Sequence, residues 1–353
     1  MRDNFKKYKL SRRNGGDFIN EGSYGCAFTP PLGLNCRTLK RIPPNTPLIS
    51  KLFNSESHFK DEMELQKTVL AIDPRNLFTV PYYGSCHIDI NKLDIKEKSY
   101  LDKCELFSEY RSDKPDSSNI PQLIYRYGGI DLTEAFNKSE VHAVDLIPLF
   151  KPLFQGIKLL QEYKSGYAHC DIKPHNIVFD KTAQKLYIID FGLMGEMSRL
   201  KDEYDILSFD YQYYPPEFKV KSNIDFGTND INLIANYISL NYNKVPLSAI
   251  YKYWKQYYPK DKSFHEHLKL FIKNSIDNHS KFSVDFKTVF VKKLDSYSLA
   301  MSFLEYLHRS KKVKLSADKK LKLDKFLANI ILPAIHPNPY LRIDVNEILR
   351  RFI

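Results

Sequence analysis

The alternation of apolar and polar positions changes along the chain, and each change predicts a different kind of element. Residues 18 to 53 carry short β-like runs broken by glycines and by the proline-rich stretch 43–47, a pattern typical of strands and loops. Residues 55 to 72 switch to apolar spacing at threes and fours, which predicts a helix that ends before Pro74. The first part of the chain is therefore expected to be rich in strands, with one long helix.

The pattern that follows predicts a polar insertion and then a mainly helical region. Residues 86 to 120 are rich in Lys, Asp and Ser and separate two strand-like runs. The second run leads into Gly128 and Gly129, which suit a bend between two domains because they lack side chains. Residues 146 to 163 have helical spacing, residues 186 to 189 form an apolar strand, and further helices follow to the C-terminus.

Length and composition agree with a folded protein of about two domains. The chain has 353 residues, of which 43% are hydrophobic and 27% charged, values near the average for globular proteins. Lys and Arg number 53 against 42 Asp and Glu, a net charge of +11 that favours acidic partners: nucleotide phosphates, nucleic acid, anionic lipid or acidic protein. Much of the excess lies in residues 244–294, with eleven lysines against four acids, and in residues 307–325. These segments predict a basic surface.

The cysteines and the apolar runs bear on the compartment. Five cysteines are scattered along the chain without a Cys-x-x-Cys pair or a zinc-like histidine spacing, so we expect free thiols in a reducing compartment. No apolar run approaches the roughly 18 residues that span a bilayer. The N-terminal segment lacks the apolar core of a secretory signal. These features predict an intracellular protein.

Two motifs combine residues that can bind phosphate and metal. Gly22 and Gly25 stand three apart between strand-like flanks, and glycines let backbone amides approach phosphate oxygens. Taken alone, such a turn is usually only a hairpin. Residues 169–176 read HCDIKPHN, and Asp190-Phe191-Gly192 follows at the end of an apolar strand. Two acids and an amide at these spacings can supply a base beside a hydroxyl nucleophile and oxygen ligands for Mg²⁺.

These motifs, in this order, resemble the signature set of the protein kinases, and the resemblance spans about residues 18 to 345. It implies an α+β, two-lobed protein kinase fold, with a β-rich N-lobe and a mainly helical C-lobe that carries a large helical insertion after the activation segment. The implied organisation is a basic tail at 1–17, an N-lobe at 18–124 with the polar insertion near 86–120, a hinge at 125–129, and a C-lobe at 130–353 with the insertion near 218–294.

The resemblance also implies roles for individual residues. Asp171 matches the catalytic base and Lys173 the lysine that contacts the transferring phosphate, while Asn176 and Asp190 match the metal ligands. The positions that match the nucleotide-binding residues are Gly22, Ser23, Gly25, Ala27, Lys51 and Glu62.

Lys51 lies in the strand-like run 47–53, and its partner should be a glutamate on the next helix. Glu62 and Glu64 both qualify, and they lie on different faces because they are two residues apart. We prefer Glu62, since Leu65 and Val69 then form the neighbouring buried face.

Three further residues match structural positions of the family. Glu217, in the run YYPPE at 213–217, resembles the glutamate at the end of the activation segment, and Arg342 resembles the late arginine that pairs with it. Asp295 resembles the acid that opens the central C-lobe helix and holds the backbone of the catalytic loop.

Two departures from the family pattern concern the catalytic loop and the activation segment. Cys170 replaces the arginine that usually precedes the catalytic Asp, so we expect activity without phosphorylation of the activation segment. Asp210 stands where serine/threonine kinases usually have Thr. Together with the long insertion, the chain looks similar to the divergent serine/threonine kinases of large cytoplasmic DNA viruses, which would place it in the host cytoplasm or the virion.

The resemblance implies a serine/threonine protein kinase that uses ATP and Mg²⁺, with Mn²⁺ as the alternative metal. Lys173 is the variant associated with serine/threonine acceptors. The partners are then protein substrates, acidic ones if the basic segments select them, and these segments also suit a virion surface or an anionic membrane. No specific nucleic acid is expected, because no nucleic-acid-binding motif is present. The alternatives are a pseudokinase scaffold and a small-molecule phosphotransferase on a kinase-like fold.

Overall fold

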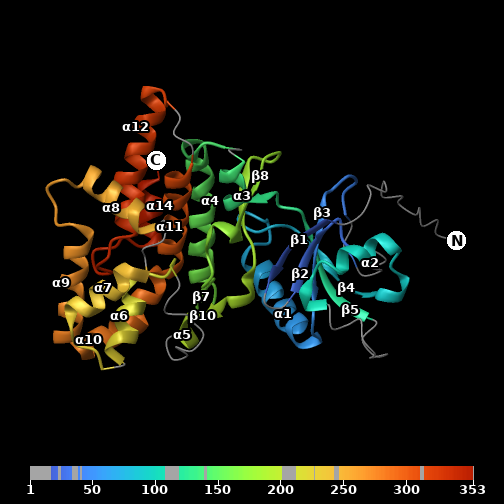
Figure 1. Ribbon diagram of the computed structural model, residues 1–353, viewed down its shortest axis with the longest axis horizontal. Coiled ribbons are helices and arrows are strands. Elements are labelled where there is room, and N and C mark those ends of the chain that lie inside the picture. Colours follow the sequence, from blue (N-terminus) through green and yellow to red (C-terminus); the bar gives the residue numbers. More distant parts are fainter. Residues whose placement is uncertain are drawn as a thin grey trace. The chain divides into compact units, whose positions relative to one another are not determined.

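The computed structural model describes residues 17–22, 25–33, 39, 42–107, 119–138, 141–200, 212–225, 227–241, 246–310 and 314–352. The chain divides into two compact units: a first unit of Met1–Leu70 and Val80–Gly128, and a second unit of Ala71–Thr79 and Gly129–Ile353. The first unit is built on a β-sheet and the second mainly on helices (Figure 1). The predicted α+β class is confirmed.

The first unit contains a five-stranded antiparallel sheet in the order β1–β2–β3–β5–β4. Its strands are β1 (Asp17–Gly22), β2 (Gly25–Thr29), β3 (Leu48–Phe53), β4 (Tyr82–Asp89) and β5 (Asn119–Arg126). Alternation along β3 sends Leu52 and Phe53 to opposite faces of the sheet, and both side chains are fully buried. The sheet is therefore covered on both faces.

Helix α1 (Glu56–Ile72) covers the face of the sheet to which Phe53 points. Its N-terminus is capped by Ser55, whose hydroxyl accepts a hydrogen bond from the backbone N–H of His58 at 3.2 Å. Phe59 of α1 packs edge-on against Phe53, with ring centroids 5.7 Å apart. The helix predicted for residues 55 to 72 is confirmed.

The opposite face of the sheet is covered by the segment predicted as a polar insertion. The segment forms η1 (Ile90–Lys92) and α2 (Ile95–Leu101), and its residues 108–118 lie outside the described part of the chain. Asp94 and Glu97 form a reciprocal capping box at the start of α2. Buried residues of this segment, including Leu101 and Phe107, join the core that contains Leu52.

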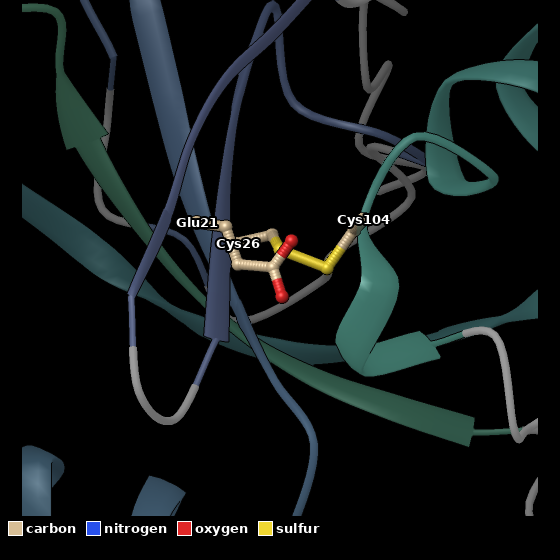
Figure 2. Close-up of side chains that lie close together, drawn as sticks. All are labelled: Glu21, Cys26 and Cys104. Carbon is tan, nitrogen blue, oxygen red and sulfur yellow. A yellow bond between two sulfur atoms is a disulfide. The ribbon is translucent and has the colours of Figure 1, made fainter.

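The prediction that the cysteines are free thiols is wrong for the described cysteines of the first unit. Cys26 of β2 and Cys104, which follows α2, form a disulfide across 78 residues of sequence (Figure 2). Cys86 is also disulfide-bonded, while Cys36 lies outside the described residues. Cys170 is a buried free thiol. The fold of the sheet brings β2 close to the insertion, and the spacing of the cysteines in the sequence does not reveal this proximity. The reducing compartment was predicted from free thiols, so the disulfide removes the basis of that prediction.

The second unit consists mainly of helices. The long ones include α4 (Ala143–Glu162) and α11 (Leu294–Arg309), which pack together through Phe150 and Phe303 with ring centroids 5.1 Å apart. Every residue of α11 from Leu294 to Tyr306 is buried, as expected for a helix at the centre of a unit. No helix among the described residues is long and apolar enough to cross a membrane.

The described part of the second unit contains further helical segments. They are α3 (Leu132–Asn137), η4 (Pro174–Asn176), η5 (Phe191–Leu193), α5 (Met197–Leu200), α6 (Pro216–Asp225), α7 (Ile231–Asn241), α8 (Pro246–Tyr257), α9 (Phe264–Asp277), α10 (His279–Asp285), η7 (Phe286–Phe290), η8 (Val291–Lys293), α12 (Ala317–Phe326), η9 (Leu327–Ile331), α13 (Leu332–Ala334) and α14 (Val345–Arg351). The described part of the region predicted as a helical insertion, 218–294, contains α7 to α10 and is mainly helical.

Two small sheets lie in the described part of the second unit. One has the order β6–β8–β9 and the other pairs β10 with β7. Their strands are β6 (Ile130–Asp131), β7 (Tyr167–Ala168), β8 (Ile177–Asp180), β9 (Lys185–Ile188) and β10 (Gly195–Glu196). Gly129 enters β6 with φ +97°, and a Cβ there would lie 2.0 Å from the carbonyl oxygen of Phe179. Glycine is therefore required at this bend.

Residues 71–79 belong to the second unit, although most of α1, which precedes them in the chain, belongs to the first. The carboxylate of Asp73, which is 2% exposed, accepts hydrogen bonds from the backbone N–H groups of Leu77, Phe78 and Thr79 at 2.7 to 3.0 Å. The carbonyl of Phe78 then accepts from Ile188 N at 2.7 Å. This turn therefore anchors the chain to β9.

Candidate active site

Lys51 and Glu62 form an ion pair inside the first unit. The Nζ atom of Lys51 on β3 donates to both carboxylate oxygens of Glu62 on α1, at 2.9 and 2.7 Å, and the Glu62 side chain is 12% exposed. Glu64 is 67% exposed and pairs with Lys67 instead, because two residues turn a helix by about 200°. The structure therefore forms the preferred pair of the two that the sequence left open.

The glycine-rich hairpin consists of β1 and β2, where Gly22 pairs with Gly25. A Cβ at Gly25 would lie 2.1 Å from the carbonyl oxygen of Leu52, so the close approach of β3 is by itself enough to require glycine here. Ala27 lies directly opposite Lys51 in the β2–β3 register. Ser23 lies outside the described residues.

Three of the predicted catalytic and metal-binding residues contact one another in the second unit. Lys173 Nζ donates to both carboxylate oxygens of Asp171, at 3.0 and 2.9 Å. The side-chain amide of Asn176, at the end of η4, donates to the carboxylate and to the backbone carbonyl of Asp171, both at 2.8 Å. The Asp171 carboxylate is therefore held by three hydrogen bonds and remains an acceptor in a fixed orientation.

The backbone before Asp171 is anchored by the central helix. Asp295, in the first turn of α11, accepts from the N–H groups of His169 at 2.7 Å and Cys170 at 3.1 Å. Burial raises the pKa of this fully buried carboxyl group, against the lowering effect of His169 and the two backbone donors. This confirms the contact that was expected between Asp295 and the catalytic loop.

Cys170 adopts a left-handed backbone conformation, with φ +64°. Such a conformation in a non-glycine residue costs about 1–3 kcal/mol and persists only where neighbours hold it. Here Asp295 holds the N–H, and the hydroxyl of Tyr214 donates to the carbonyl oxygen at 2.7 Å. Burial, and then the charges of Asp295 and Asp171, raise the pKa of the Cys170 thiol. The thiol is therefore neutral and supplies no cation.

Asp190 follows β9, and hydrogen bonds of its neighbour Ile189 hold this part of the chain next to the catalytic loop. The N–H of Ile189 donates to the carbonyl oxygen of Asn176 at 3.0 Å, and its carbonyl oxygen lies 3.2 Å from Nε2 of His169. Asp190 itself is exposed, with φ +62°. The structure therefore places the chain at Asp190 beside Asn176.

Phe191 fixes the other side of Asp190. Its buried ring packs against His169 with centroids 4.7 Å apart and against Phe78 with centroids 6.4 Å apart. The ring thus joins the catalytic loop to the turn that follows Asp73. Apolar packing of Phe191 therefore contributes to the position of this motif in the second unit.

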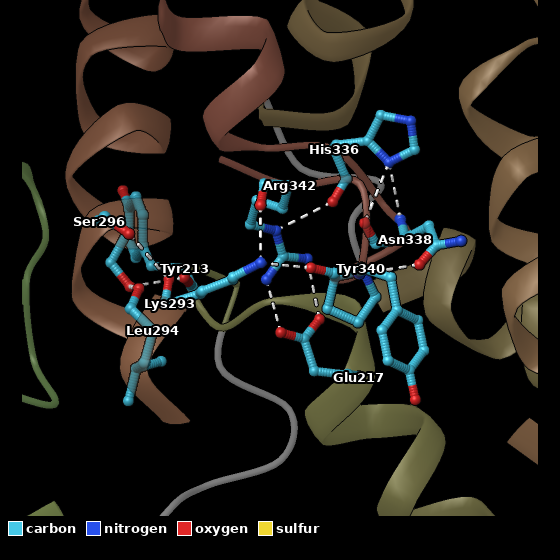
Figure 3. A network of polar contacts seen from close by, with 11 residues as sticks. Tyr213, Glu217, Lys293, Leu294, Ser296, His336, Asn338, Tyr340 and Arg342 are labelled. Atoms are coloured by element: carbon cyan, nitrogen blue, oxygen red, sulfur yellow. Dashed lines mark hydrogen bonds and ion pairs between the residues drawn. The ribbon is translucent and has the colours of Figure 1, made fainter. Parts of the chain in front are cut away.

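Glu217 and Arg342 form the predicted ion pair, and both side chains are completely buried (Figure 3). The guanidinium donates to the two carboxylate oxygens at 2.5 and 2.9 Å, and its Nε donates to the carbonyl oxygen of His336 at 3.0 Å. It also lies over the ring of Tyr297, with 4.8 Å to the centroid. The pair connects α6 to the loop before α14, and the further contacts of Arg342 with His336 and Tyr297 give it a structural role.

The donor set of Asn176 and Asp190 suits a hard divalent cation. Because the Asn176 nitrogen donates to Asp171, the amide oxygen faces away from that bond. Asp190 has an exposed carboxylate and directly follows Ile189, whose N–H donates to the carbonyl oxygen of Asn176. Among the described residues, the group of His, Cys, Asp or Glu side chains close enough to share a metal is Glu21, Cys26 and Cys104. Its two sulfurs are bonded to each other, so this group does not replace the predicted ligands.

Comparison with known proteins identifies the family. A sequence profile of the protein kinase domain matches residues 127–349, more than half of the chain. The chain belongs to the protein kinase family. The match covers the catalytic loop, Asp190, Glu217 and Arg342 of this kinase, and it begins after the Gly-rich hairpin and Lys51. The Lys51–Glu62 ion pair in the first unit is therefore an observation independent of that match.

Three curated relatives are similar to parts of the kinase. A probable serine/threonine-protein kinase of Dictyostelium discoideum is 38% identical over 96 residues, 27% of this chain and 7% of the relative. The serine/threonine-protein kinase prpf4B of the same organism is 36% identical over 84 residues, 24% of this chain and 9% of the relative. The citron rho-interacting kinase of Rattus norvegicus is 25% identical over 187 residues, 46% of this chain and 9% of the relative.

The chain thus spans less than a tenth of the length of these relatives within the matched regions. None of these three comes from a virus, so the resemblance to viral kinases stays a prediction.

One contact at the site was missed by the sequence analysis. Tyr214 belongs to the recognised YYPPE run, yet its hydrogen bond to Cys170 was not foreseen. The signal was present, because a tyrosine that is buried usually finds a partner for its hydroxyl. The partner could not be named, because 44 residues separate the two positions.

Proposed function

We propose that this kinase transfers the γ-phosphoryl group of ATP to serine or threonine hydroxyls of protein substrates. The observation that carries the proposal is the catalytic loop, in which Asp171, Lys173 and Asn176 hold one another by hydrogen bonds of 2.8 to 3.0 Å. This arrangement combines a fixed carboxylate acceptor with a cation beside it. Both are needed where a hydroxyl attacks a phosphoryl group.

Asp171 acts on the acceptor hydroxyl in this mechanism. Its carboxylate accepts the hydroxyl hydrogen and orients the oxygen toward the phosphorus atom. Lys173 fixes the orientation of the carboxylate by donating to both of its oxygens, and its ammonium offsets negative charge on the transferring group. Asn176 fixes the position of Asp171 from the other side.

Asn176 and Asp190 would hold Mg²⁺, or Mn²⁺ as the alternative. The bound metal would neutralise negative charge on the phosphate oxygens of ATP. In the first unit, Lys51 would bind nucleotide phosphate, and Glu62 holds its ammonium in place. Gly22, Ser23, Gly25 and Ala27 would belong to the hairpin that covers the phosphates.

A pseudokinase scaffold is the competing function. Such a protein needs no fixed base, whereas here Asp171 is bonded to both Lys173 and Asn176. A scaffold also needs no ion pair at Lys51. The two functions differ in one measurable property, the transfer of labelled phosphate.

We propose acidic protein substrates, because helix α12 presents a basic surface. Lys320, Lys322 and Lys325 are exposed on this helix, which belongs to the segment with an excess of positive charge. Attraction between exposed charges decays over about 8 Å at physiological salt. The preference for acidic sequences should therefore weaken as salt is added.

The first prediction tests the reaction. Purified protein incubated with γ-labelled ATP and Mg²⁺ should label acidic more than basic substrate proteins, and the label should lie on serine or threonine. Hydrolysis of the labelled substrate, followed by separation of the phosphoamino acids, measures this. A panel of small alcohols and aminoglycosides serves as the comparison. Label on these compounds alone, or no phosphoryl transfer with Mg²⁺ or with Mn²⁺, would contradict the proposal.

The second prediction concerns Glu62. The variant Glu62→Gln should raise KM for ATP about tenfold, because a charge-assisted hydrogen bond is worth about 1.5 kcal/mol. Glu64→Gln is the matched control, since Glu64 lies on the same helix but pairs with Lys67 at the surface. Steady-state kinetics at varied ATP concentrations measures both variants. Equal KM values for the two variants would show that the Lys51–Glu62 pair has no part in nucleotide binding.

A further inference from the structure

A disulfide lies beside the glycine-rich hairpin of the first unit. Cys26 follows Gly25 directly on β2 and lies opposite Glu21 of β1. Cys104 belongs to residues 102–107, which we call the strap, and Figure 2 shows the S–S bond joining β2 to this segment after α2. The strap is thus covalently attached one residue away from Gly25.

A second link joins the strap to the other strand of the hairpin. The carboxylate of Glu21 on β1 accepts hydrogen bonds from the backbone N–H groups of Glu105 at 3.0 Å and Leu106 at 3.2 Å. Bonds to an ionised acceptor are stronger than neutral ones. The strap therefore holds both strands of the hairpin, β2 by a covalent bond and β1 by a carboxylate.

The strap buries the two sulfur atoms, while some of its own side chains are exposed to solvent. Cys26 is 1% exposed and Cys104 fully buried, while Lys103 and Glu105 of the strap are exposed. A reductant therefore reaches the sulfurs when the strap opens locally, as short surface segments do. Because Phe107 of the strap belongs to the core that contains Leu52, this opening must also release Phe107 from that core.

We propose that Cys26 and Cys104 form a redox modification site, at which a dithiol reductant loosens the hairpin and weakens ATP binding. The inference rests on the proposed function, because it assigns the hairpin to nucleotide binding. A thiolate of the reductant attacks one sulfur and forms a mixed disulfide, and its second thiol then releases the protein. Two electrons and two protons pass from the dithiol, which becomes a disulfide, while Cys26 and Cys104 become thiols. A disulfide oxidant reverses the step.

The physical reason is preorganisation. With the disulfide intact, β1 and β2 are fixed before the nucleotide arrives. After reduction, the hairpin keeps its pairing with β3, the bonds to Glu21 and its packing, but it loses the covalent link to the strap, so nucleotide binding must order it further. We expect KM for ATP to rise about fivefold or more, within the range of couplings between sites. The turnover number should change little, because Asp171, Lys173 and Asn176 belong to the second unit.

The third prediction is this redox effect, measured on the full chain. Protein purified without reductant is compared before and after treatment with dithiothreitol. Mass mapping of peptides reports the Cys26–Cys104 bond, kinetics report KM for ATP, and amide hydrogen exchange of residues 17–29 reports the hairpin without nucleotide. Reduction should raise KM and speed exchange in this segment.

Two variants separate this bond from the other disulfide. The double variant Cys26→Ser with Cys104→Ser should behave like the reduced protein and no longer respond to dithiothreitol. Cys86→Ser removes the other described disulfide-bonded cysteine and should keep the response. If a variant fails to fold, titration of the unmodified protein with dithiothreitol still tests the inference.

The possible outcomes distinguish failure of the redox inference from failure of the proposed kinase function. Equal KM and equal exchange in the oxidised and reduced protein overturn the inference and leave kinase activity standing. Free thiols at Cys26 and Cys104 after mild oxidation overturn it as well. Faster exchange on reduction without phosphoryl transfer in either state overturns the proposed function and retains redox control of the hairpin.

Discussion

Replacing Asp171 with asparagine should lower kcat for protein phosphorylation about 100-fold or more. Asparagine keeps the size of the side chain and can still accept a hydrogen bond from Lys173, so the loop should retain its shape. It cannot accept the proton of the acceptor hydroxyl. Initial rates with saturating labelled ATP measure the loss, and circular dichroism checks the fold.

The matched control is Asp277→Asn, an exposed acid at the end of α9 in the same unit. This substitution removes the same charge and should leave the rate within about twofold of the unmodified protein. Retention of full activity in Asp171→Asn would remove the basis of the proposed mechanism. Equal losses in both variants would indicate an effect of net charge and not of position.

The elements that the sequence predicted well are those whose signal is local. The helix at 55–72 and the strand run at 47–53 were expected from periodicity, and they correspond to α1 and β3. The catalytic loop was recognisable because Asp171 to Asn176 are contiguous, so their spacing alone brings them together. Local patterns suffice where the interacting residues are close in sequence.

The choice between Glu62 and Glu64 shows where local pattern becomes weak. Both glutamates lie on α1, and helical spacing places them on different faces without saying which face meets β3. Tertiary packing decides, because Phe59 docks on Phe53 and turns Glu62 toward Lys51. The preference for Glu62 was correct, although of the two residues on which it rested Val69 is buried and Leu65 only half-buried.

The disulfide shows what sequence reasoning could not supply. Cys26 and Cys104 are separated by 78 residues and by two strands of the sheet, β3 and β4. Nothing in the spacing of five scattered cysteines selects this pair. It requires that the insertion fold back over β2, which its polar composition did not suggest. The buried side of that insertion rests on a few apolar residues, among them Leu101 and Phe107.

Replacing Arg342 with methionine should lower the free energy of unfolding of the second unit by about 3–5 kcal/mol. The substitution leaves the carboxylate of Glu217 completely buried without its guanidinium partner. Lys293 lies close by, but its ammonium donates to the carbonyl oxygens of Pro339 and Arg342, and burial lowers its pKa. It is therefore already engaged and does not replace the lost cation.

The single tryptophan of the chain provides the measurement. Trp254 lies in the second unit and packs against His336, with ring centroids 5.3 Å apart. Its fluorescence during urea unfolding reports the unit that contains the ion pair. Arg350→Met is the matched control, because Arg350 is 75% exposed in its pair with Glu347 and such a pair is worth less than about 1 kcal/mol.

The double variant Glu217→Met with Arg342→Met separates an unpaired charge from a lost attraction. If the loss in the single variant comes from burying an unpaired carboxylate, removal of both charges should restore most of the stability. If instead attraction between the two groups stabilises the fold, the double variant should be as unstable as the single one. We expect restoration, because both side chains are completely buried and their desolvation opposes the attraction.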